Sequence, residues 1–396
     1  MSIGRRFYAL GPQCVLKRLE EPCLYDLQND ELYELSDDAY QFLLKCARGE
    51  SPPIRPEDEA FIQFCLSEGL IVPSEAPVPR KVLSNPSPIP SLRYLELLIT
   101  DRCNLRCRHC YLGDGHRQDL PLDCIERVLR EFEELQGLRL LLSGGEPLLH
   151  PEFWKLNERV RDFPFRSVLL SNGTLITPDV ARRLRVHEVQ LSLDGIKEGH
   201  EALRGEGTFE RTVLVIDHLQ EVGIAVSIAT MIHRGNLTEF DALASLVRSK
   251  NIREWNVDVP CLEGRLKDHA DHWVSPEEAG PLLTYGFGGG FHSSEKNATC
   301  GAHLCAIMTD GKVAKCGLFG AEPVGSVEEG LRVCWERIPR IALSELRCHC
   351  SEIETCRGGC RYRAKAQGGL YEPDLFQCYA RGVLKGGEKH DDSEDR

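Results

Sequence analysis

Six short apolar runs alternate with amphipathic stretches between residues 92 and 280, and this alternation limits the fold more than any other feature of the chain. The runs have the length of buried strands, and the stretches between them repeat apolar residues at helical spacing. Repeated strand–helix units form parallel sheets with right-handed crossovers. We therefore predict an α/β fold, a partial (β/α)6 TIM-like barrel. The expected strands cover residues 93–99, 138–143, 166–171, 187–193, 224–230 and 253–259.

Polar motifs follow four of these strands. In a parallel barrel, the groups of an active site gather at the carboxyl ends of the strands. We therefore expect the four motifs to meet at one end of the barrel. They are Thr100-Asp101, Ser143 to Glu146, Ser171 to Gly173 and Ser192 to Gly195.

The region before the barrel, residues 1–75, has the pattern of a small independent unit. An expected hairpin over 23–35 turns at Asn29-Asp30, and two helical patterns follow, the first capped by Ser36. A hairpin with two helices predicts a winged-helix-like unit. The stretch 76–91 contains most of a run of six prolines without apolar periodicity, which indicates an extended linker.

The region after the barrel, residues 281–385, has little periodic structure and most of the clustered cysteines. We expect it to bury little apolar surface, so that metal–thiolate bonds supply its folding energy. It is thus predicted to be a cysteine-rich metal-binding domain. The last residues, 386–396, are typical of a solvated acidic tail.

Composition narrows the class of protein. The chain has 396 residues, of which 42% are hydrophobic and 28% charged, as in a soluble globular protein of two or three domains. No apolar run approaches the ~20 residues that span a bilayer. We also expect no signal peptide and a cytoplasmic location. The net charge of −13 makes nucleic acid and anionic lipid poor partners, because phosphate contacts need clustered Lys and Arg.

Clustered cysteines point to metal chemistry. The chain has 18 Cys, and in a cytosolic protein such clusters bind metals or carry out redox chemistry more often than they form disulfides. Cys103, Cys107 and Cys110 lie within eight residues after the first expected strand. Three thiolates can hold three irons of a [4Fe–4S] cluster and leave the fourth iron open. The alternative is a zinc site with His109 as fourth ligand.

The segment TDRCNLRCRHCY, with Tyr111 after the last cysteine, resembles the cluster loop of radical S-adenosylmethionine (radical SAM) enzymes. SGGEP (143–147) and SLDG (192–195) resemble further motifs of this family. The resemblance implies that Cys103, Cys107 and Cys110 are the catalytic cluster ligands and that SAM is cleaved to a 5′-deoxyadenosyl radical. It also implies SAM-binding residues, with Glu146 as the main contact of the methionine amine. These are Tyr111, Gly144, Gly145, Glu146, Asn172, Ser192, Asp194 and Arg204.

The C-terminal cysteines resemble the SPASM extension of peptide-modifying radical SAM enzymes, which holds two auxiliary [4Fe–4S] clusters. The resemblance implies two ligand sets. The first is Cys300, Cys305, Cys316 and Cys360, and the second is Cys348, Cys350, Cys356 and Cys378. The family usually has two residues between the first two ligands of the second set, and here only His349 separates them. This leaves open whether both thiols bind one cluster or whether His349 is a ligand.

The N-terminal unit resembles PqqD-like elements that capture the leader of a precursor peptide as an extra strand. The alternative is a dimerising or packing module. Together the resemblances imply an enzyme that oxidatively modifies a ribosomally made peptide, for example by a thioether crosslink, with flavodoxin or ferredoxin as electron donor. Two alternatives stay open: oxidative decarboxylation of a tetrapyrrole side chain in haem synthesis, and a zinc-rich interaction scaffold without catalysis.

Other cysteines and histidines have simpler interpretations. We expect four cysteines on apolar faces to be buried small hydrophobes, namely Cys46, Cys65, Cys124 and Cys334. Cys261 follows the sixth expected strand near the barrel mouth, where it either packs or contacts substrate. Structural roles are expected for His187, His200 and His218.

Overall fold

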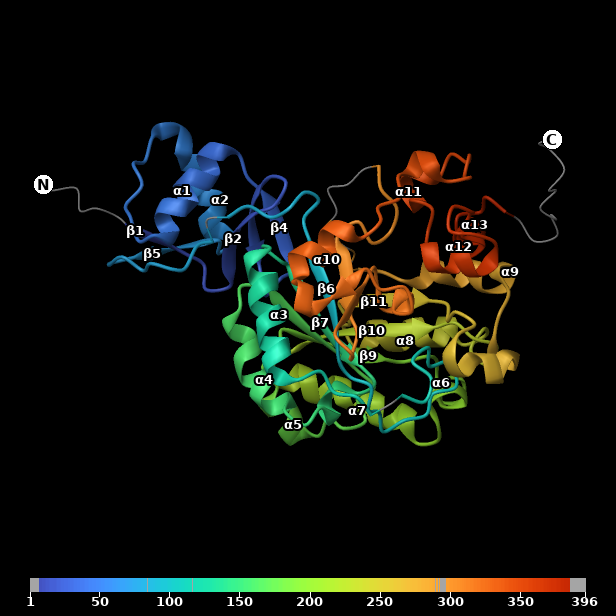
Figure 1. Ribbon diagram of the computed structural model, residues 1–396. Coiled ribbons are helices and arrows are strands. Elements are labelled where there is room, and N and C mark those ends of the chain that lie inside the picture. Colours follow the sequence, from blue (N-terminus) through green and yellow to red (C-terminus); the bar gives the residue numbers. More distant parts are fainter. Residues whose placement is uncertain are drawn as a thin grey trace, which may run out of the picture.

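A nine-stranded sheet forms the centre of the molecule (Figure 1). The computed structural model describes residues 7–83, 85–115, 117–288, 290, 292 and 297–384, so the acidic tail predicted at 386–396 lies outside the described residues. The strand order is β11-β10-β9-β8-β7-β6-β12-β13-β14, and the strands from β11 to β12 are parallel. All six predicted strands are present, each within one or two residues of its expected bounds. They are β6 (Tyr94–Thr100), β7 (Arg139–Gly144), β8 (Arg166–Ser171), β9 (Glu188–Ser192), β10 (Ala225–Met231) and β11 (Glu254–Asp258).

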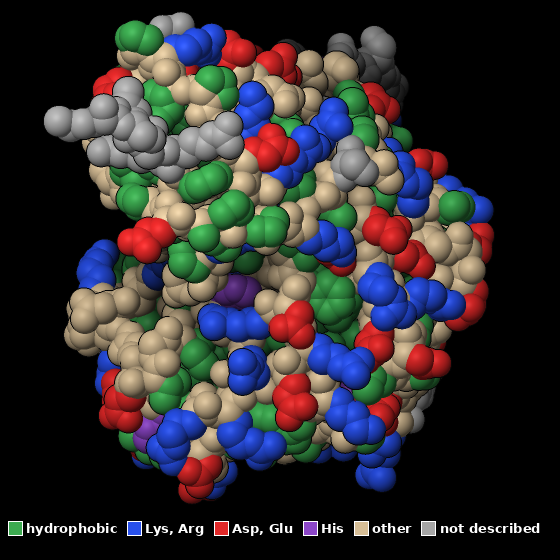
Figure 2. Space-filling model, turned by 90° about the vertical axis from the view of Figure 1, so that its left-hand side faces the viewer, with side chains coloured by type: hydrophobic (Ala, Val, Ile, Leu, Met, Phe, Trp, Pro, Cys, Tyr) green, Lys and Arg blue, Asp and Glu red, His purple; other side chains and the backbone are tan. Residues whose placement is uncertain are grey.

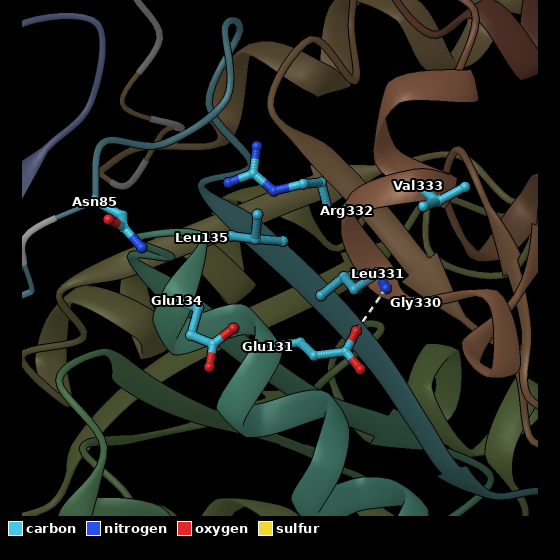
Figure 3. A pocket seen from close by; sticks show the side chains of 8 residues that line it. All are labelled: Asn85, Glu131, Glu134, Leu135, Gly330, Leu331, Arg332 and Val333. Carbon is cyan, nitrogen blue, oxygen red and sulfur yellow. Dashed lines mark hydrogen bonds between the residues drawn. The ribbon is translucent and has the colours of Figure 1, made fainter.

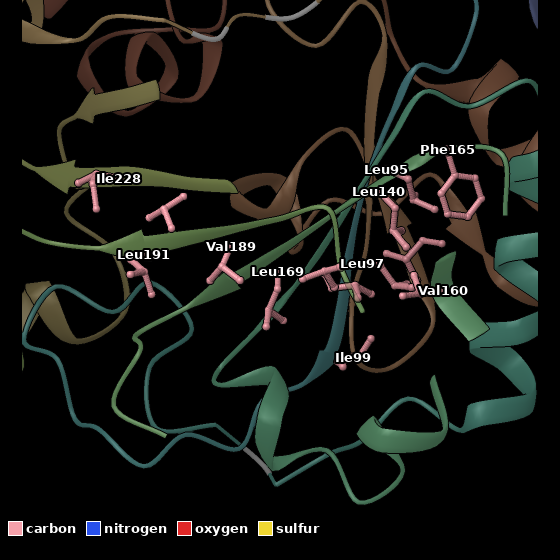
Figure 4. Close-up of a cluster of buried hydrophobic side chains, with 14 of the residues drawn as sticks. Leu95, Leu97, Ile99, Leu140, Val160, Phe165, Leu169, Val189, Leu191 and Ile228 are labelled. Atoms are coloured by element: carbon pink, nitrogen blue, oxygen red, sulfur yellow. The ribbon is translucent and has the colours of Figure 1, made fainter. Parts of the chain in front are cut away.

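Helices cover the outer face of this sheet and leave its inner face to the barrel interior (Figure 1). On β6, Leu95, Leu97 and Ile99 are fully buried against the helix layer (Figure 4). Glu96, between them, lines the cavity on the inner face. Such alternation is expected of a strand between two environments. The helices between the sheet strands are α3 (Leu122–Glu134), α4 (Phe153–Arg159), α5 (Pro178–Arg183), α6 (Lys197–Arg204), α7 (Thr208–Glu221) and α8 (Phe240–Ser249).

Helix α3 shows why these sequences form the outer layer. Its apolar residues recur every three or four positions, at Ile125, Val128, Leu129 and Phe132, and all four are buried in the sheet–helix core. One apolar stripe on an otherwise charged helix packs that stripe against the sheet. The strand–helix pattern therefore predicted both the sheet and the layer of helices that packs on it. The predicted α/β class is confirmed.

The C-terminal region corrects one prediction. We expected residues 281–385 to bury little apolar surface, but β12 (Leu304–Ile307) adds to the sheet beside β6, and Leu331 and Trp335 are fully buried in the same core. The expectation was wrong because elements of two to seven residues are too short to show periodicity in the sequence. The region also contains β13 (Lys312–Ala314), β14 (Gly325–Ser326), α10 (Leu331–Arg337), α11 (Ile353–Cys356), α12 (Arg361–Gln367) and α13 (Leu375–Ala380), and α9 (Pro276–Ala279) lies just before it.

Helix α10 docks on α3, and Figure 3 shows this contact. The backbone N–H of Leu331 donates a hydrogen bond of 2.6 Å to a carboxylate oxygen of Glu131. Beside it lies a surface cavity of about 350 Å³ lined by both helices and by Asn85. The C-terminal region is thus attached to the barrel by ordinary packing and hydrogen bonding, at a place distant in sequence from the clustered cysteines.

The N-terminal unit has the predicted hairpin and two helices. The hairpin turns where expected, with Asp30 at a φ of 58°, and the hydroxyl of Ser36 accepts a hydrogen bond from the N–H of Ala39 to begin the first helix. Five strands belong to this unit, and the sequence indicated only two of them. They are β1 (Phe7–Leu10), β2 (Cys14–Arg18), β3 (Pro22–Asp26), β4 (Glu31–Glu34) and β5 (Ile71–Ser74), with helices α1 (Asp37–Ala47) and α2 (Glu59–Ser67).

Buried charges join this unit to the amino ends of the barrel strands. Arg139, the first residue of β7, pairs with Asp30. Arg166, the first residue of β8, donates to the carbonyl oxygens of Leu27 (2.6 Å) and Gln28 (2.8 Å). Because the strands start here, the N-terminal unit lies at the end of the sheet opposite to the polar motifs.

Most single-residue expectations about burial are met. Cys46, Cys65 and Cys334 are fully buried, and His187 and His200 are buried as well. Cys124 is only half-buried, because it lies at the edge of α3 beside Arg127, so the prediction for this residue was wrong. No helix in the described part of the chain is both long and apolar enough to cross a membrane. On the face shown in Figure 2, Lys and Arg side chains are interspersed with Asp and Glu.

Candidate active site

A cavity of about 290 Å³ opens at the carboxyl ends of the parallel strands. Cys103, Cys107 and Cys110, from the loop after β6, lie on one wall of it. The ends of the neighbouring strands contribute further lining residues, namely Ser143, Gly144, Gly145, Asn172, Ser192 and Met231. The cavity has the place expected from the parallel topology, and it gathers residues that are far apart in the sequence, from Glu96 to Leu318.

Two glycines let the turn after β7 press against the cysteine loop. A Cβ atom on Gly144 would lie 2.1 Å from the carbonyl oxygen of Thr100, and one on Gly145 would lie 2.4 Å from that of Arg102. Gly144 also has a φ of 136°, which side chains rarely adopt. The N–H of Gly145 donates to the Thr100 carbonyl at 2.8 Å. The glycine pair is therefore required by close backbone contact beside the three thiols.

A buried ion pair lies next to the thiols. Arg204, at the end of α6, donates from Nε to a carboxylate oxygen of Asp194 at 2.5 Å, and its Nη1 lies 3.8 Å from the sulfur of Cys107. Burial opposes ionisation of Asp194, but the charge of Arg204 outweighs it and holds the pKa of that carboxyl well below its usual range. The guanidinium is thus held in a fixed position at the cavity wall.

Glu146 lies behind the cavity rather than in it. Both of its carboxylate oxygens accept from the hydroxyl of Ser171 at 3.0 Å, and one also accepts from the N–H of Asn172 at 3.0 Å. Burial raises the pKa of Glu146 to about 7. Glu146 therefore does not line the cavity, because its oxygens accept hydrogen bonds from the turn after β8, and its contact with the methionine amine stays a prediction.

The predicted site residues fall into two groups in the structure. Most of them line the cavity, and these are Cys103, Cys107, Cys110, Tyr111, Gly144, Gly145, Asn172, Ser192 and Arg204. Glu146 and Asp194 are fully buried behind this wall and hydrogen-bond to residues of it.

Sequence reasoning missed Glu96, which lines the cavity from the middle of β6. Its carboxylate accepts from the N–H of Gly317 at 3.1 Å, and burial raises its pKa. A Cβ on Gly317 would lie 3.0 Å from this carboxylate and 2.9 Å from the hydroxyl of Tyr111, so Gly317 lies against two residues that line the cavity. A signal was present in the sequence, because Glu96 is the one charged residue in the run YLELLIT.

His109 also lines the cavity. Burial lowers the pKa of this imidazole to about 3, so it is neutral. Its Nδ1 is buried and has no hydrogen-bond partner among the residues that the structure describes. A buried polar atom of this kind is expected where a bound molecule supplies the partner.

The cysteines of the second C-terminal set lie together. Cys348, Cys350, Cys356 and Cys378 all line one small cavity, together with residues that include Asp374 and Arg381. The one-residue spacer around His349 therefore does not separate the first two thiols.

The first C-terminal set is divided. Cys360 lies near both Cys300 and Cys316: the N–H of the next residue, Arg361, donates to the sulfur of Cys300, and charge on Cys360 adds to the effect of burial in raising the pKa of Cys316 to about 12. Cys261 belongs to the same neighbourhood, since burial and then charge on Cys360 raise the pKa of its thiol to about 12. Cys305 is fully buried in the sheet–helix core instead.

The donor chemistry suits iron–sulfur clusters. Soft thiolates in sets of three or four are the usual ligands of such clusters. No group of three or more Cys, His, Asp or Glu side chains within the described ranges converges closely enough to hold a single metal ion. The thiols of a four-iron cluster bind different irons and need not converge on one point.

Comparison with known proteins agrees with this arrangement. A family model described as Radical SAM superfamily matches residues 97–247, which contain the three thiols and the four polar motifs. The chain therefore contains a radical SAM domain, the domain of enzymes that use a [4Fe–4S] cluster and SAM.

The similar proteins can be named individually. An AdoMet-dependent heme synthase of Nitratidesulfovibrio vulgaris is 28% identical over 234 residues, which cover 55% of this chain and 62% of that protein. Mycofactocin maturase MftC of Mycobacterium tuberculosis is 33% identical over 178 residues, covering 43% of this chain and 46% of that protein. The matched parts thus span about half to three fifths of these relatives.

Among solved structures, SuiB of Streptococcus suis has the same fold. With bound S-adenosylmethionine it matches 93% of this chain and 100% of its own at a TM-score of 0.65 and 16% identity. With its precursor peptide SuiA it matches 94% of this chain and 100% of its own, at a TM-score of 0.65 and 15% identity. The shared fold extends beyond the barrel, over both the N-terminal unit and the C-terminal region.

Proposed function

We propose that this protein is a radical SAM peptide maturase, which cleaves SAM and oxidatively modifies a ribosomally made precursor peptide, for example by forming a thioether crosslink. The observation that carries the proposal is the single cavity in which three loop thiols face the ends of the parallel strands beside Arg204. The name of the relative MftC as a maturase and the complex of SuiB with its precursor peptide support the choice of substrate class.

Within the cavity the protein's own side chains bind and orient. Cys103, Cys107 and Cys110 would hold a [4Fe–4S] cluster, which when bound supplies the electron that splits SAM and so yields a 5′-deoxyadenosyl radical. Arg204 presents a fixed positive charge for the methionine carboxylate, and Ser192 presents its hydroxyl for the ribose. The neighbouring Gly144, Gly145, Asn172 and Tyr111 form the rest of the binding wall.

Glu146 and Asp194 act as positioning residues in this proposal. Glu146 fixes the turn that carries Asn172, and Asp194 fixes Arg204. Asp194 also accepts from the N–H of Met231 at 2.8 Å, which joins the ends of β9 and β10. Such supporting contacts orient binding groups within a fraction of an ångström.

The C-terminal thiols would hold auxiliary clusters, whose place in the reaction is to accept the electron left after oxidation of the peptide. The set of Cys348, Cys350, Cys356 and Cys378 has the four thiolates that one four-iron cluster needs. The ligands of the other cluster are considered below. We place the enzyme in the cytoplasm, where thiols stay reduced, with a flavodoxin or ferredoxin as electron donor.

The N-terminal unit is the proposed site for the leader of the precursor. Strand β4 pairs with β3 and, within the described strands, with no other, so its second edge can accept an extended peptide. Tyr33 on this strand packs edge to face on Phe64 at 6.2 Å, and Phe64 is 46% exposed. These two rings give an apolar contact for a leader side chain beside the open edge.

The test uses the full chain, reconstituted anaerobically with iron and sulfide and supplied with SAM, a reductant and short peptides encoded by neighbouring reading frames. We expect 5′-deoxyadenosine and a peptide product that is lighter by two hydrogen atoms per thioether. The triple variant Cys103→Ala/Cys107→Ala/Cys110→Ala is the matched control and should give neither. Failure of the wild-type protein to cleave SAM would overturn the proposal.

A second function is favoured by one observation, the similarity to a heme synthase over 234 residues. In that case the substrate is a tetrapyrrole that loses carbon dioxide from side chains. Incubation of the same preparation with iron-coproporphyrin, followed by mass spectrometry, distinguishes the two functions. Loss of carbon dioxide with all candidate peptides unchanged would replace the first proposal by the second.

A further inference from the structure

Cys305 faces away from the cavity. In the register of β12 against β6, Cys305 pairs with Leu95, and both are fully buried in the core under the helix layer. Ile307, two residues further along β12, belongs to the same core. Because side chains alternate between the two faces of a strand, this pairing fixes Cys305 on the outer face of the sheet.

Cys316 lies on the inner face. Ala314 at the end of β13 pairs with Ala306, which in turn pairs with the inward-facing Glu96. The residue after Cys316, Gly317, donates its N–H to the Glu96 carboxylate at 3.1 Å. The sheet therefore lies between Cys305 and Cys316, and a single cluster cannot be reached from both of its faces.

The start of helix α12 gathers the other thiols of this set. The helix begins directly after Cys360, and the N–H of Arg361 donates to the sulfur of Cys300 at 3.3 Å. The next residue, Tyr362, packs edge to face on Phe319 at 5.1 Å. Phe319 belongs to the turn that begins at Cys316, so two cysteine loops meet the first turn of this helix.

The third residue of the helix reaches the loop after β11. Arg363 pairs with Asp258, the last residue of β11, and also donates to Asp374 at 2.8 Å. Asp374 in turn accepts from the N–H of Cys360 at 2.8 Å. These bonds hold the loop that carries Cys261, three residues after Asp258, against the same helix start. Cys261 also lines the main cavity.

We propose that Cys261, together with Cys300, Cys316 and Cys360, binds the first auxiliary cluster, and that Cys305 is a core residue without a metal. This inference rests on the proposed presence of auxiliary clusters. It gives the cluster the four thiolates that a four-iron cluster takes. It also places the cluster at the edge of the main cavity, because Cys261 belongs to both.

The test removes the SAM-binding cluster first, so that only auxiliary iron is counted. In the full chain carrying Cys103→Ala, Cys107→Ala and Cys110→Ala, two auxiliary clusters correspond to about eight irons per chain. Cys261→Ala is added to this background, and Cys305→Val serves as the matched control that keeps an apolar core side chain. Iron and sulfide content and electron paramagnetic resonance spectra are measured after anaerobic reconstitution.

We expect Cys261→Ala to lower the iron content by up to half, or to give a three-iron signal on oxidation, while Cys305→Val leaves both readouts unchanged. Cys261→Ser, which keeps the side-chain size, should shift the spectrum of one cluster if the alanine variant does not fold. Unchanged spectra and iron in both Cys261 variants would overturn the assignment. Loss of iron from Cys305→Val at unchanged melting temperature would also overturn it.

The same experiment distinguishes a wrong ligand assignment from the absence of auxiliary clusters. A triple-alanine background without iron would show that the chain has no auxiliary clusters, and both proposals about them would fall together. A background with about eight irons that is insensitive to Cys261 would refute the ligand assignment alone.

Discussion

The two ends of the parallel sheet carry different kinds of residue. At the amino ends of β7 and β8, Arg139 and Arg166 are buried and bonded to the N-terminal unit. At the carboxyl ends, thiols, glycines and hydroxyls surround a cavity of about 290 Å³. The comparison teaches that one sheet separates two tasks: charged side chains join domains at one end, and the other end stays open for a ligand. Changes at one end should therefore leave the other end's property intact.

The largest expected effect is the loss of SAM cleavage in the triple variant Cys103→Ala/Cys107→Ala/Cys110→Ala. Without these thiolates nothing holds the cluster from which the electron comes, so formation of 5′-deoxyadenosine should fall to the background rate. The amount is measured by liquid chromatography. Unfolding in denaturant should change little, because the three residues lie in a loop. Wild-type turnover in this variant would refute the assignment of the cavity.

At the opposite end, Arg166→Met should destabilise the fold by about 3–5 kcal/mol. Arg166 is fully buried, and its loss leaves the buried carboxylate of Glu188 without its ionic partner at 2.6 Å. Denaturant unfolding of the purified protein measures the change. The double variant Arg166→Met/Glu188→Gln should recover part of it, because the uncompensated charge is removed. An equal loss in the double variant would contradict the buried-charge explanation.

A smaller effect at this same end depends on pH. His187 precedes β9, and its Nδ1 accepts from the N–H of Ser167 at 3.1 Å. Burial lowers the pKa of His187 to about 3, below the ~6.5 of an unfolded histidine. The unfolded chain therefore binds the proton more readily, and stability is complete above pH 6.5 and is lost as the pH falls from there.

The size of this loss can be measured by difference. The buried histidine should lower the free energy of unfolding by about 2 kcal/mol at pH 5 relative to pH 7. His187→Asn offers an acceptor oxygen that does not titrate, so it serves as the control. The stability difference between wild type and variant should shift by this amount between the two pH values, and a constant difference would contradict the buried neutral state of His187.

The smallest expected effect is at the open end again. Glu146→Gln keeps the size of the side chain but removes the charge that accepts from Ser171 and Asn172. We expect binding of SAM to weaken about tenfold, as for other residues that orient a binding group. Equilibrium dialysis of the reconstituted protein measures the affinity. A direct contact between Glu146 and SAM would instead predict a far larger loss of SAM binding in Glu146→Gln. It would also predict that Glu146→Ala leaves the fold as stable as Glu146→Gln does.

The sequence could predict the barrel because its strands appear as short, largely apolar runs that alternate with amphipathic helices. It could not predict β12 to β14, since strands of two to four residues have no period that can be recognised. The four polar motifs could be placed at one end from topology alone. The difference between Asn172, which lines the cavity, and Glu146, which lies behind it, depends on side-chain hydrogen bonds that the sequence does not contain.

The cysteines show the same limit in another form. Spacing along the chain groups Cys305 with Cys300 and Cys316, but spacing does not tell on which face of a strand a side chain lies. The register of β12 with β6 supplies that information. Cys261 is 39 positions before Cys300, and tertiary contacts such as the bond between Arg363 and Asp258 bring its loop to the start of α12.

Because the N-terminal unit is attached at the amino ends of the strands, a peptide bound to it must extend along the barrel to reach the cavity. A strand of seven residues such as β6 is roughly 23 Å long, at about 3.3 Å per residue. A peptide gripped at β4 would need a spacer of at least about seven extended residues to travel outside the barrel to its mouth. The enzyme would then leave the peptide positions nearest the bound segment unmodified and would modify only positions beyond the minimum spacer.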